Sequence, residues 1–128
     1  MTMPTSPSER PLLDRSALEA IRALQSDATP DLLVRVVHLY FDSAPELIAR
    51  VRSGLAERDH NAVRVAAHTL KSSSANLGAT SLAEMCKQLE MAARSGILDG
   101  ALPDADAVER EYRAVRAALE AEIGETTA

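Results

Sequence analysis

His68 carries the side chain with the clearest capacity for covalent chemistry. An imidazole is a good nucleophile near neutral pH, and it can attack an acyl phosphate and hold the phosphoryl group on nitrogen. At about 100° per residue, a helix places Arg64 and Lys71 one turn to either side of His68, with the small residues Ser72 and Ala75 on the same face. The two cations would offset the charge of a phosphohistidine, and the small residues would leave room for a partner. These five residues form our candidate site.

The opposite face of the same segment is apolar. Val63, Ala66, Leu70 and Leu77 fall at about 160–220° from His68 on a helical wheel. A helix packed through this stripe would expose the imidazole, as entry into a partner's site requires. The alternative stays open here, because a single histidine flanked by cations is more often an ordinary solvated residue on a polar face.

Two amphipathic segments precede this one. Ser16 and Glu19 have the spacing of a capping box, which predicts a short first helix. Thr29 is a candidate N-cap for a long apolar stripe that runs to Leu55. Pro45 interrupts that stripe, which indicates either one kinked helix or two helices meeting there.

Three further helices are indicated. Asp59 can cap the helix that carries His68, and Gly78 can end it in a left-handed conformation. Ser81 begins another capping box, and the helix after it should end near Gly96. A last apolar stripe covers residues 108–123. No segment shows strand alternation, so we expect an all-α fold, an antiparallel four-helix bundle with an additional short N-terminal helix.

Composition limits the classes of function. The 128 residues suit one domain, which we place at 12–123, with 1–11 as a flexible lead or linker and 124–128 as a disordered tail. The net charge of −5 argues against nucleic-acid binding and against an anionic membrane. The lone cysteine, Cys86, and the absence of an apolar leader or span favour a cytoplasmic protein.

The segment His68–Ala79 (HTLKSSSANLGA) resembles the signature of histidine-containing phosphotransfer (HPt) domains. That signature has a histidine, a variable residue, an aliphatic residue, lysine, glycine, two small residues, two variable positions, an aliphatic residue and glycine, often followed by alanine. The matching residues are His68, Leu70, Lys71, Ser73, Ser74, Leu77, Gly78 and Ala79. The resemblance covers about residues 12–123 and favours a single kinked helix through Pro45.

The resemblance implies a phosphorelay intermediate of two-component signal transduction. His68 would be the phosphorylated nucleophile, Lys71 would stabilise the phosphoryl group, and Glu90 would face the His68 neighbourhood. Partners would be receiver domains and a hybrid sensor histidine kinase, which would dock around His68 on the second and third helices. The protein would have no cofactor of its own, because the receiver brings the Mg²⁺.

Ser72 departs from the signature, in which glycine usually follows the lysine. Glycine minimises bulk beside the imidazole, and serine is the next smallest polar choice. Its hydroxyl could donate a hydrogen bond to a phosphoryl oxygen, so we expect function to survive with altered transfer rates.

Other functions explain less of the sequence. The scattered glycines form no nucleotide-binding loop, so we expect a monomeric phosphocarrier rather than a kinase. A non-catalytic helical scaffold that docks a signalling partner would account for the helices but not for the alignment of His68 and Lys71. A degenerate domain that docks a receiver without accepting phosphate conflicts with the intact histidine. His38 and His60 suit structural or surface roles, and Cys86 suits a buried one.

Overall fold

The computed structural model describes residues 12–98 and 103–124. Those residues form five helices and no strand: α1 (Arg15–Arg22), α2 (Leu32–Glu57), α3 (His60–Asn76), α4 (Thr80–Ser95) and α5 (Ala105–Glu122). The expectation of an all-α fold is confirmed. The predicted lead at 1–11 and nearly all of the predicted tail lie outside the described residues.

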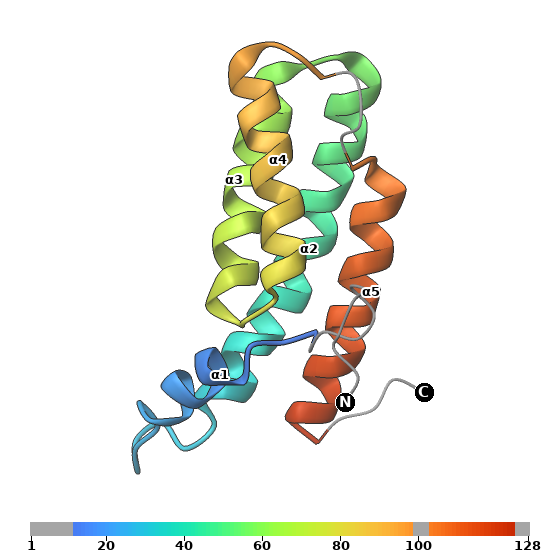
Figure 1. Cartoon of the computed structure of the whole chain (residues 1–128). Coiled ribbons are helices and arrows are strands. Elements are labelled where there is room, and N and C mark those ends of the chain that lie inside the picture. The colour runs from blue at the N-terminus through green and yellow to red at the C-terminus, as the bar shows by residue number, and fades with distance from the viewer. Residues whose placement is uncertain (1–11, 99–102, 125–128) are drawn as a thin grey trace, which may run out of the picture.

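The four long helices run alongside one another in alternating directions (Figure 1). Helix α1 lies across one end of this bundle, where Arg15 and Arg22 of α1 form ion pairs with Glu122 at the end of α5. The architecture is the predicted antiparallel four-helix bundle with an additional short N-terminal helix. None of the described helices is both long enough and apolar enough to cross a membrane.

Helix α2 is one continuous helix of 26 residues with Pro45 in its interior, as the resemblance predicted. Its start differs from the prediction, because the N-cap is Asp31 rather than Thr29. Asp31 makes no capping hydrogen bond through its side chain. Instead, the backbone N–H of Leu33 donates to Oε1 of Gln25 at 3.1 Å, a non-local partner that the local pattern did not reveal.

Helix α3 begins and ends as its sequence predicts. The carboxylate of Asp59 accepts a hydrogen bond from the backbone N–H of Ala62 at 3.0 Å, and Gly78 adopts a left-handed φ of 79° just beyond the helix. The two predicted capping boxes are wrong. Asp14 rather than Ser16 caps α1, and α4 begins after Ala79, before Ser81.

The predicted stripe of α3 is buried, which fixes the rotation of the helix about its own axis. Its residues are at most 1% exposed: Val63, Ala66, Ala67, Leu70, Ser74 and Leu77. The hydroxyl groups of Ser74 and Tyr40 lie 2.8 Å apart in the core and set the level of α3 against α2. Gly54 of α2 allows close packing, since a Cβ there would lie 2.8 Å from a methyl group of Val63.

Candidate functional site

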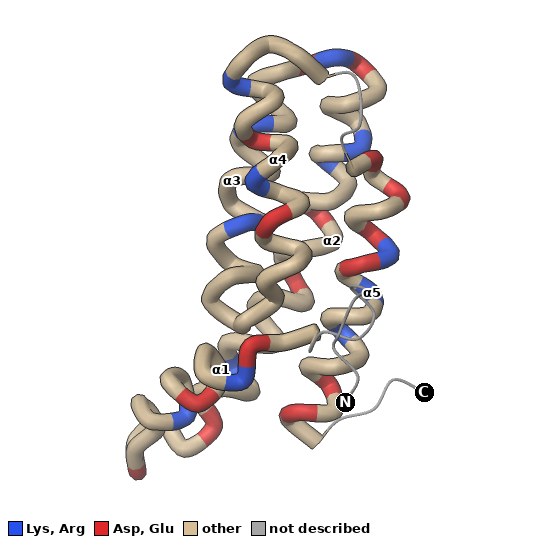
Figure 2. The backbone as a smooth tube through the Cα atoms, viewed as in Figure 1, with Lys and Arg blue, Asp and Glu red and all other residues tan. Residues whose placement is uncertain are grey.

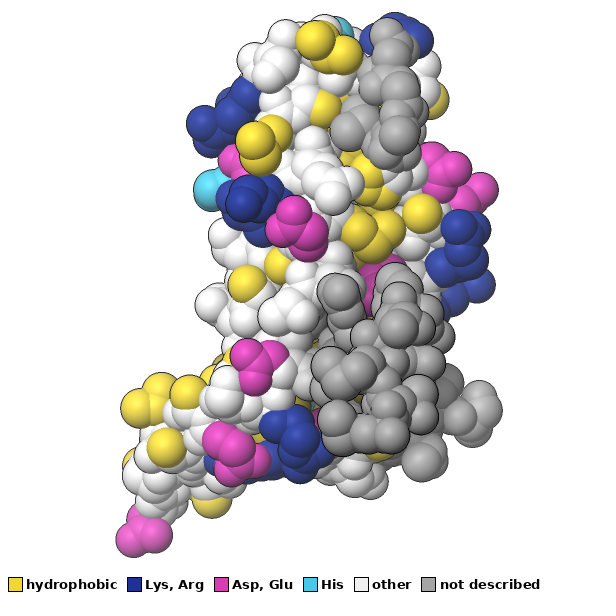
Figure 3. All heavy atoms as spheres, viewed as in Figure 1, with side chains coloured by type: hydrophobic (Ala, Val, Ile, Leu, Met, Phe, Trp, Pro, Cys, Tyr) yellow, Lys and Arg dark blue, Asp and Glu magenta, His cyan; other side chains and the backbone are white. Residues whose placement is uncertain are grey.

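His68 projects from the outer face of α3. Its side chain is 54% exposed, whereas the stripe on the other side of the helix is buried. A histidine protrudes from the α3 side of the molecule next to basic and acidic side chains (Figure 3). The imidazole of His68 is therefore exposed, as the helical wheel predicts.

Glu90 of α4 holds the inner edge of the imidazole. Its side chain is only 5% exposed, and Oε2 lies 2.8 Å from Nδ1 of His68. Because an ionised carboxylate can only accept a hydrogen bond, Nδ1 carries the hydrogen in this contact. The other ring nitrogen, Nε2, then keeps its lone pair, which is the state a nucleophile needs.

Two cations stabilise the buried charge of Glu90. Nζ of Lys71 lies 2.6 Å from Oε1, and Nη2 of Arg94 lies 3.0 Å from Oε2. Acidic and basic positions of α3 and α4 lie side by side midway along the two helices (Figure 2). The hydrogen bond from Lys71 is the largest cause that lowers the pKa of Glu90 to about 2, and the hydrogen bond from His68 adds to it. Glu90 is thus a carboxylate at physiological pH despite its burial.

The structure brings together only some of the predicted site residues. His68, Lys71 and Glu90 form one cluster. Arg64 turns toward the preceding turn of α3, where Nη2 donates to Oδ1 of Asn61 at 2.8 Å. The hydroxyl of Ser72 donates a hydrogen bond to the backbone carbonyl of His68 at 3.2 Å. The expected hydrogen bond from this hydroxyl to a phosphoryl oxygen would have to replace that contact.

Sequence reasoning missed Arg94. The signal that could have found it is the spacing of Glu90 and Arg94, since an acid and a base four residues apart on a helix commonly pair. Ala75 is exposed on α3, as the helical wheel indicates.

Other side chains of the candidate list lie apart from this cluster. Cys86 is fully buried, and burial raises the pKa of its thiol to about 12, so it is not a thiolate nucleophile. Nε2 of His60 lies 3.1 Å from the carbonyl oxygen of Gly96, at the far end of α4. Across residues 12–98 and 103–124, no three histidine, cysteine or acidic side chains are grouped as a metal site would require.

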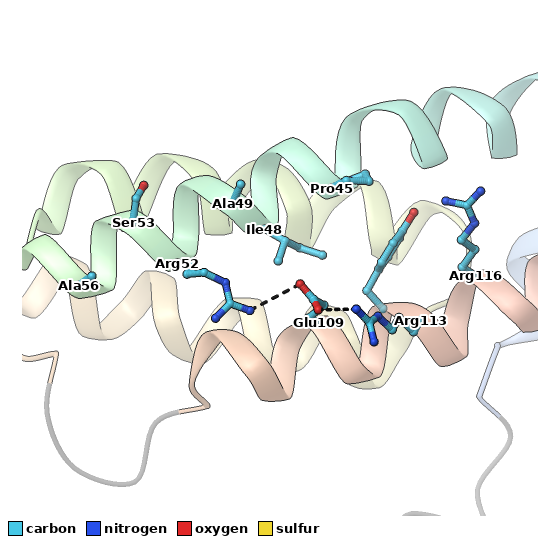
Figure 4. A pocket seen from close by; sticks show the side chains of 10 residues that line it. Pro45, Ile48, Ala49, Arg52, Ser53, Ala56, Glu109, Arg113 and Arg116 are labelled. Atoms are coloured by element: carbon cyan, nitrogen blue, oxygen red, sulfur yellow. Dashed lines mark hydrogen bonds and ion pairs between the residues drawn. The ribbon is translucent and has the colours of Figure 1, made fainter.

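A groove of about 540 Å³ lies between α2 and α5 (Figure 4). Ion pairs join Glu109 on its wall to Arg52 and Arg113. None of the residues that line it belongs to the His68 cluster. His68 therefore lies outside this groove, on the exposed face of α3.

Comparisons with known proteins agree with this geometry. The Hpt domain family matches residues 35–118. Histidine-containing phosphotransfer protein 2 of Arabidopsis thaliana is 26% identical over 103 residues, covering 78% of this chain and 66% of that protein, slightly less than two thirds. Pseudo histidine-containing phosphotransfer protein 6 of the same plant is 27% identical over 104 residues, covering 79% of this chain and 67% of that protein.

A solved structure is also similar. The crystal structure of histidine-containing phosphotransfer protein B (HptB) from Pseudomonas aeruginosa PAO1 superposes with a TM-score of 0.77 at 31% identity, covering 89% of this chain and 96% of that one. The matched family segment includes α3, with His68 and Lys71, and α4, with Glu90. The chain therefore belongs to the Hpt domain family.

Proposed function

We propose that this chain is a phosphorelay intermediate of two-component signal transduction, which accepts a phosphoryl group on His68 from a phospho-aspartyl receiver domain and passes it to another receiver, or the reverse. The observation that carries the proposal is the exposed imidazole whose Nδ1 is bound to the buried carboxylate of Glu90. That contact leaves Nε2 free to react. Membership of the Hpt domain family supports the relay role over a non-catalytic scaffold.

The chemical step follows from this geometry. The lone pair of Nε2 attacks the phosphorus atom of the receiver's aspartyl phosphate. An N–P bond forms as the O–P bond breaks, and the electron pair of the broken bond stays on the aspartate carboxylate. The hydrogen remains on Nδ1, where Glu90 stabilises the positive charge that develops on the ring. Lys71 and the receiver's Mg²⁺ would stabilise the charge of the phosphoryl group.

The surface beside His68 suits a receiver domain. Val65, one turn before His68 on α3, is 46% exposed, and Leu39 on α2 is 67% exposed. Ser72 and Ala75, which are exposed on α3, are small. Exposed apolar side chains are typical of a protein-binding surface. We therefore place the docking surface on α2 and α3, around His68.

The remaining parts of the proposal rest on the family. Hpt phosphotransfer proteins are phosphocarriers rather than kinases, and we extend this to the present chain as a monomer without its own ATP site or cofactor. A hybrid sensor histidine kinase would supply the phosphate, and the site of action would be the cytoplasm. One relative is named a pseudo phosphotransfer protein, so chemistry at His68 itself must be tested.

The test is phosphotransfer from a labelled receiver to the wild-type protein and to a His68→Gln variant. We expect an acid-labile, alkali-stable label on the wild type and none on the variant. His60→Gln is the matched control, because it changes a helical histidine that lies apart from the cluster, against the carbonyl oxygen of Gly96, and it should keep the label. Unlabelled but folded wild-type protein, tried against the receivers of its source organism, would favour the scaffold or a degenerate domain.

A further inference from the structure

Both oxygens of the Glu90 carboxylate are engaged. Oε1 accepts from Lys71 at 2.6 Å, and Oε2 accepts from His68 at 2.8 Å and from Arg94 at 3.0 Å. Glu90 is 4% exposed, so these contacts replace nearly all of its hydration. Leaving a buried carboxylate without partners is strongly destabilising, so at least one cation must stay beside Glu90.

Phosphorylation would place a second anion within reach of the same lysine. Lys71 lies one turn beyond His68 on α3, and its side chain is 30% exposed. In the unphosphorylated protein its ammonium group lies against Glu90, which binds the Nδ1 side of the ring. The phosphoryl group would be on Nε2, at the other side of the ring. The carboxylate of Glu90 and the phosphoryl group would therefore compete for the ammonium group of Lys71.

We propose that phosphorylation of His68 draws Lys71 away from Glu90 toward the phosphoryl group while Arg94 stays on Glu90, and that this competition sets the equilibrium of phosphoryl transfer. The inference rests on the phosphocarrier function proposed above. Glu90 reduces the net stabilisation that Lys71 gives to the phosphohistidine. The group consequently remains easier to pass on than it would be with a free lysine.

Arg94 makes this exchange possible. It binds Oε2, whereas Lys71 binds Oε1, so the departure of Lys71 leaves the buried charge with Arg94 and His68 as partners. Without Arg94 the carboxylate would retain Lys71 more firmly, since no cation would replace it. The pair of cations thus allows one to move while the other stays.

A double-mutant cycle isolates the competition. The equilibrium constant for transfer from a phosphorylated receiver is measured for wild type, Lys71→Ala, Glu90→Gln and the double variant. Electrostatic effects that need no movement of Lys71 add between the two sites and cancel in the cycle. Because a hydrogen bond to a charged group is involved, we expect Lys71→Ala to lower the constant by about tenfold more in the Glu90→Gln background than in the wild type.

Lys87 is the matched control. It is the other lysine of the chain and lies exposed on α4, and no hydrogen bond or ion pair joins it to Glu90 in the structure. Lys87→Ala and Glu90→Gln should therefore be additive. If the effects of Lys71→Ala and Glu90→Gln on the equilibrium constant are additive, the inference is overturned. It is also overturned if Lys71→Ala lowers the constant more in the wild type than in the Glu90→Gln background, because Glu90 would then hold the lysine in position for the phosphoryl group.

A measurement on the wild type covers the case in which Glu90→Gln fails to fold. The two lysines give two side-chain ¹⁵N resonances. Phosphorylation should change the chemical shift of the Lys71 resonance much more than that of the Lys87 resonance. Equal shifts would contradict the exchange. Absence of an acid-labile label on His68 would instead refute the proposed function, so the two failures are distinguishable.

Discussion

Gly78 joins the end of the reactive helix to the N-terminal segment, and its replacement by alanine tests this part of the fold. Its φ is 79°, and an added Cβ would lie 2.4 Å from the carbonyl oxygen of Asp14. The backbone N–H of Asp14 also donates to the carbonyl oxygen of Gly78 at 2.7 Å. Gly78→Ala therefore combines backbone strain with a clash between two backbone segments that are already hydrogen-bonded.

The cost can be estimated from these contacts. A left-handed conformation at a residue with a Cβ costs about 1 kcal/mol. If Asp14 moves away, its hydrogen bond to the carbonyl oxygen of Gly78, worth about 1 kcal/mol, is lost and the packing of the N-terminal segment against the bundle is weakened. We expect Gly78→Ala to lower the free energy of unfolding by about 2–4 kcal/mol, a large share of the stability of a domain of this size.

Gly96 provides the matched control, because its φ is 77° but no atom lies within 4 Å of an added Cβ. Gly96→Ala should therefore cost only the backbone term of about 1 kcal/mol. Both variants are unfolded in urea and followed by far-ultraviolet circular dichroism. Equal losses in the two variants would refute the steric argument, and so would a Gly78→Ala variant as stable as the wild type.

Two further predictions concern the site. Ser72→Gly should retain phosphotransfer, because the hydroxyl bonds only to the backbone of its own helix in the structure, whereas Ser72→Phe should block receiver access; a folded Phe variant that transfers at the normal rate would contradict the access argument. The hydrogen bonds from Lys71 and, to a smaller extent, from His68 lower the pKa of Glu90 from 4.5 to about 2. The carboxylate therefore contributes stability that is present above about pH 4.5 and is lost as the pH falls toward 2. This contribution to the free energy of unfolding is about 2 kcal/mol after allowance for solvent around the cations. Urea titrations at several pH values should show that the free energy of unfolding depends less on pH in this range for Glu90→Gln than for the wild type.

Much of the reactive helix could be predicted from its own residues. The spacing of Val63, Ala66 and Leu70 indicated which face is buried, and the opposite face then had to expose His68 and its neighbours. Such periodicity is a local property of a helix and survives any arrangement of its partners. Gly78 and Asp59 likewise act on the backbone within a few residues, and both were identified correctly.

The first residues of α1 and α4 were predicted less well. Asp14 replaces Ser16 at the start of α1, where the adjoining backbone is tied to Gly78, more than sixty residues away along the chain. The Ser81 pattern is a valid local signal, but α4 begins earlier, directly after the turn that Gly78 forms. The cap of α1 is itself local, because the carboxylate of Asp14 accepts a hydrogen bond from the backbone N–H of Ser16 at 3.0 Å, and aspartate is as good an N-cap as serine. The start of α4 differs by one or two residues from the prediction, which is the usual scatter of helix boundaries.

The periodicity of the residues was enough to predict an all-helical chain and an outward-facing His68 with a lysine on the same face. The resemblance placed Glu90 near that histidine, but the burial of its carboxylate, its hydrogen bond to Nδ1 and its sharing with Arg94 appear only in the folded structure. His68 and Lys71 lie on α3, whereas Glu90 and Arg94 lie on α4. Contact between them depends on how each helix is rotated about its axis and shifted along it relative to the other. Those quantities come from packing of side chains between helices, which no periodicity within a single segment contains.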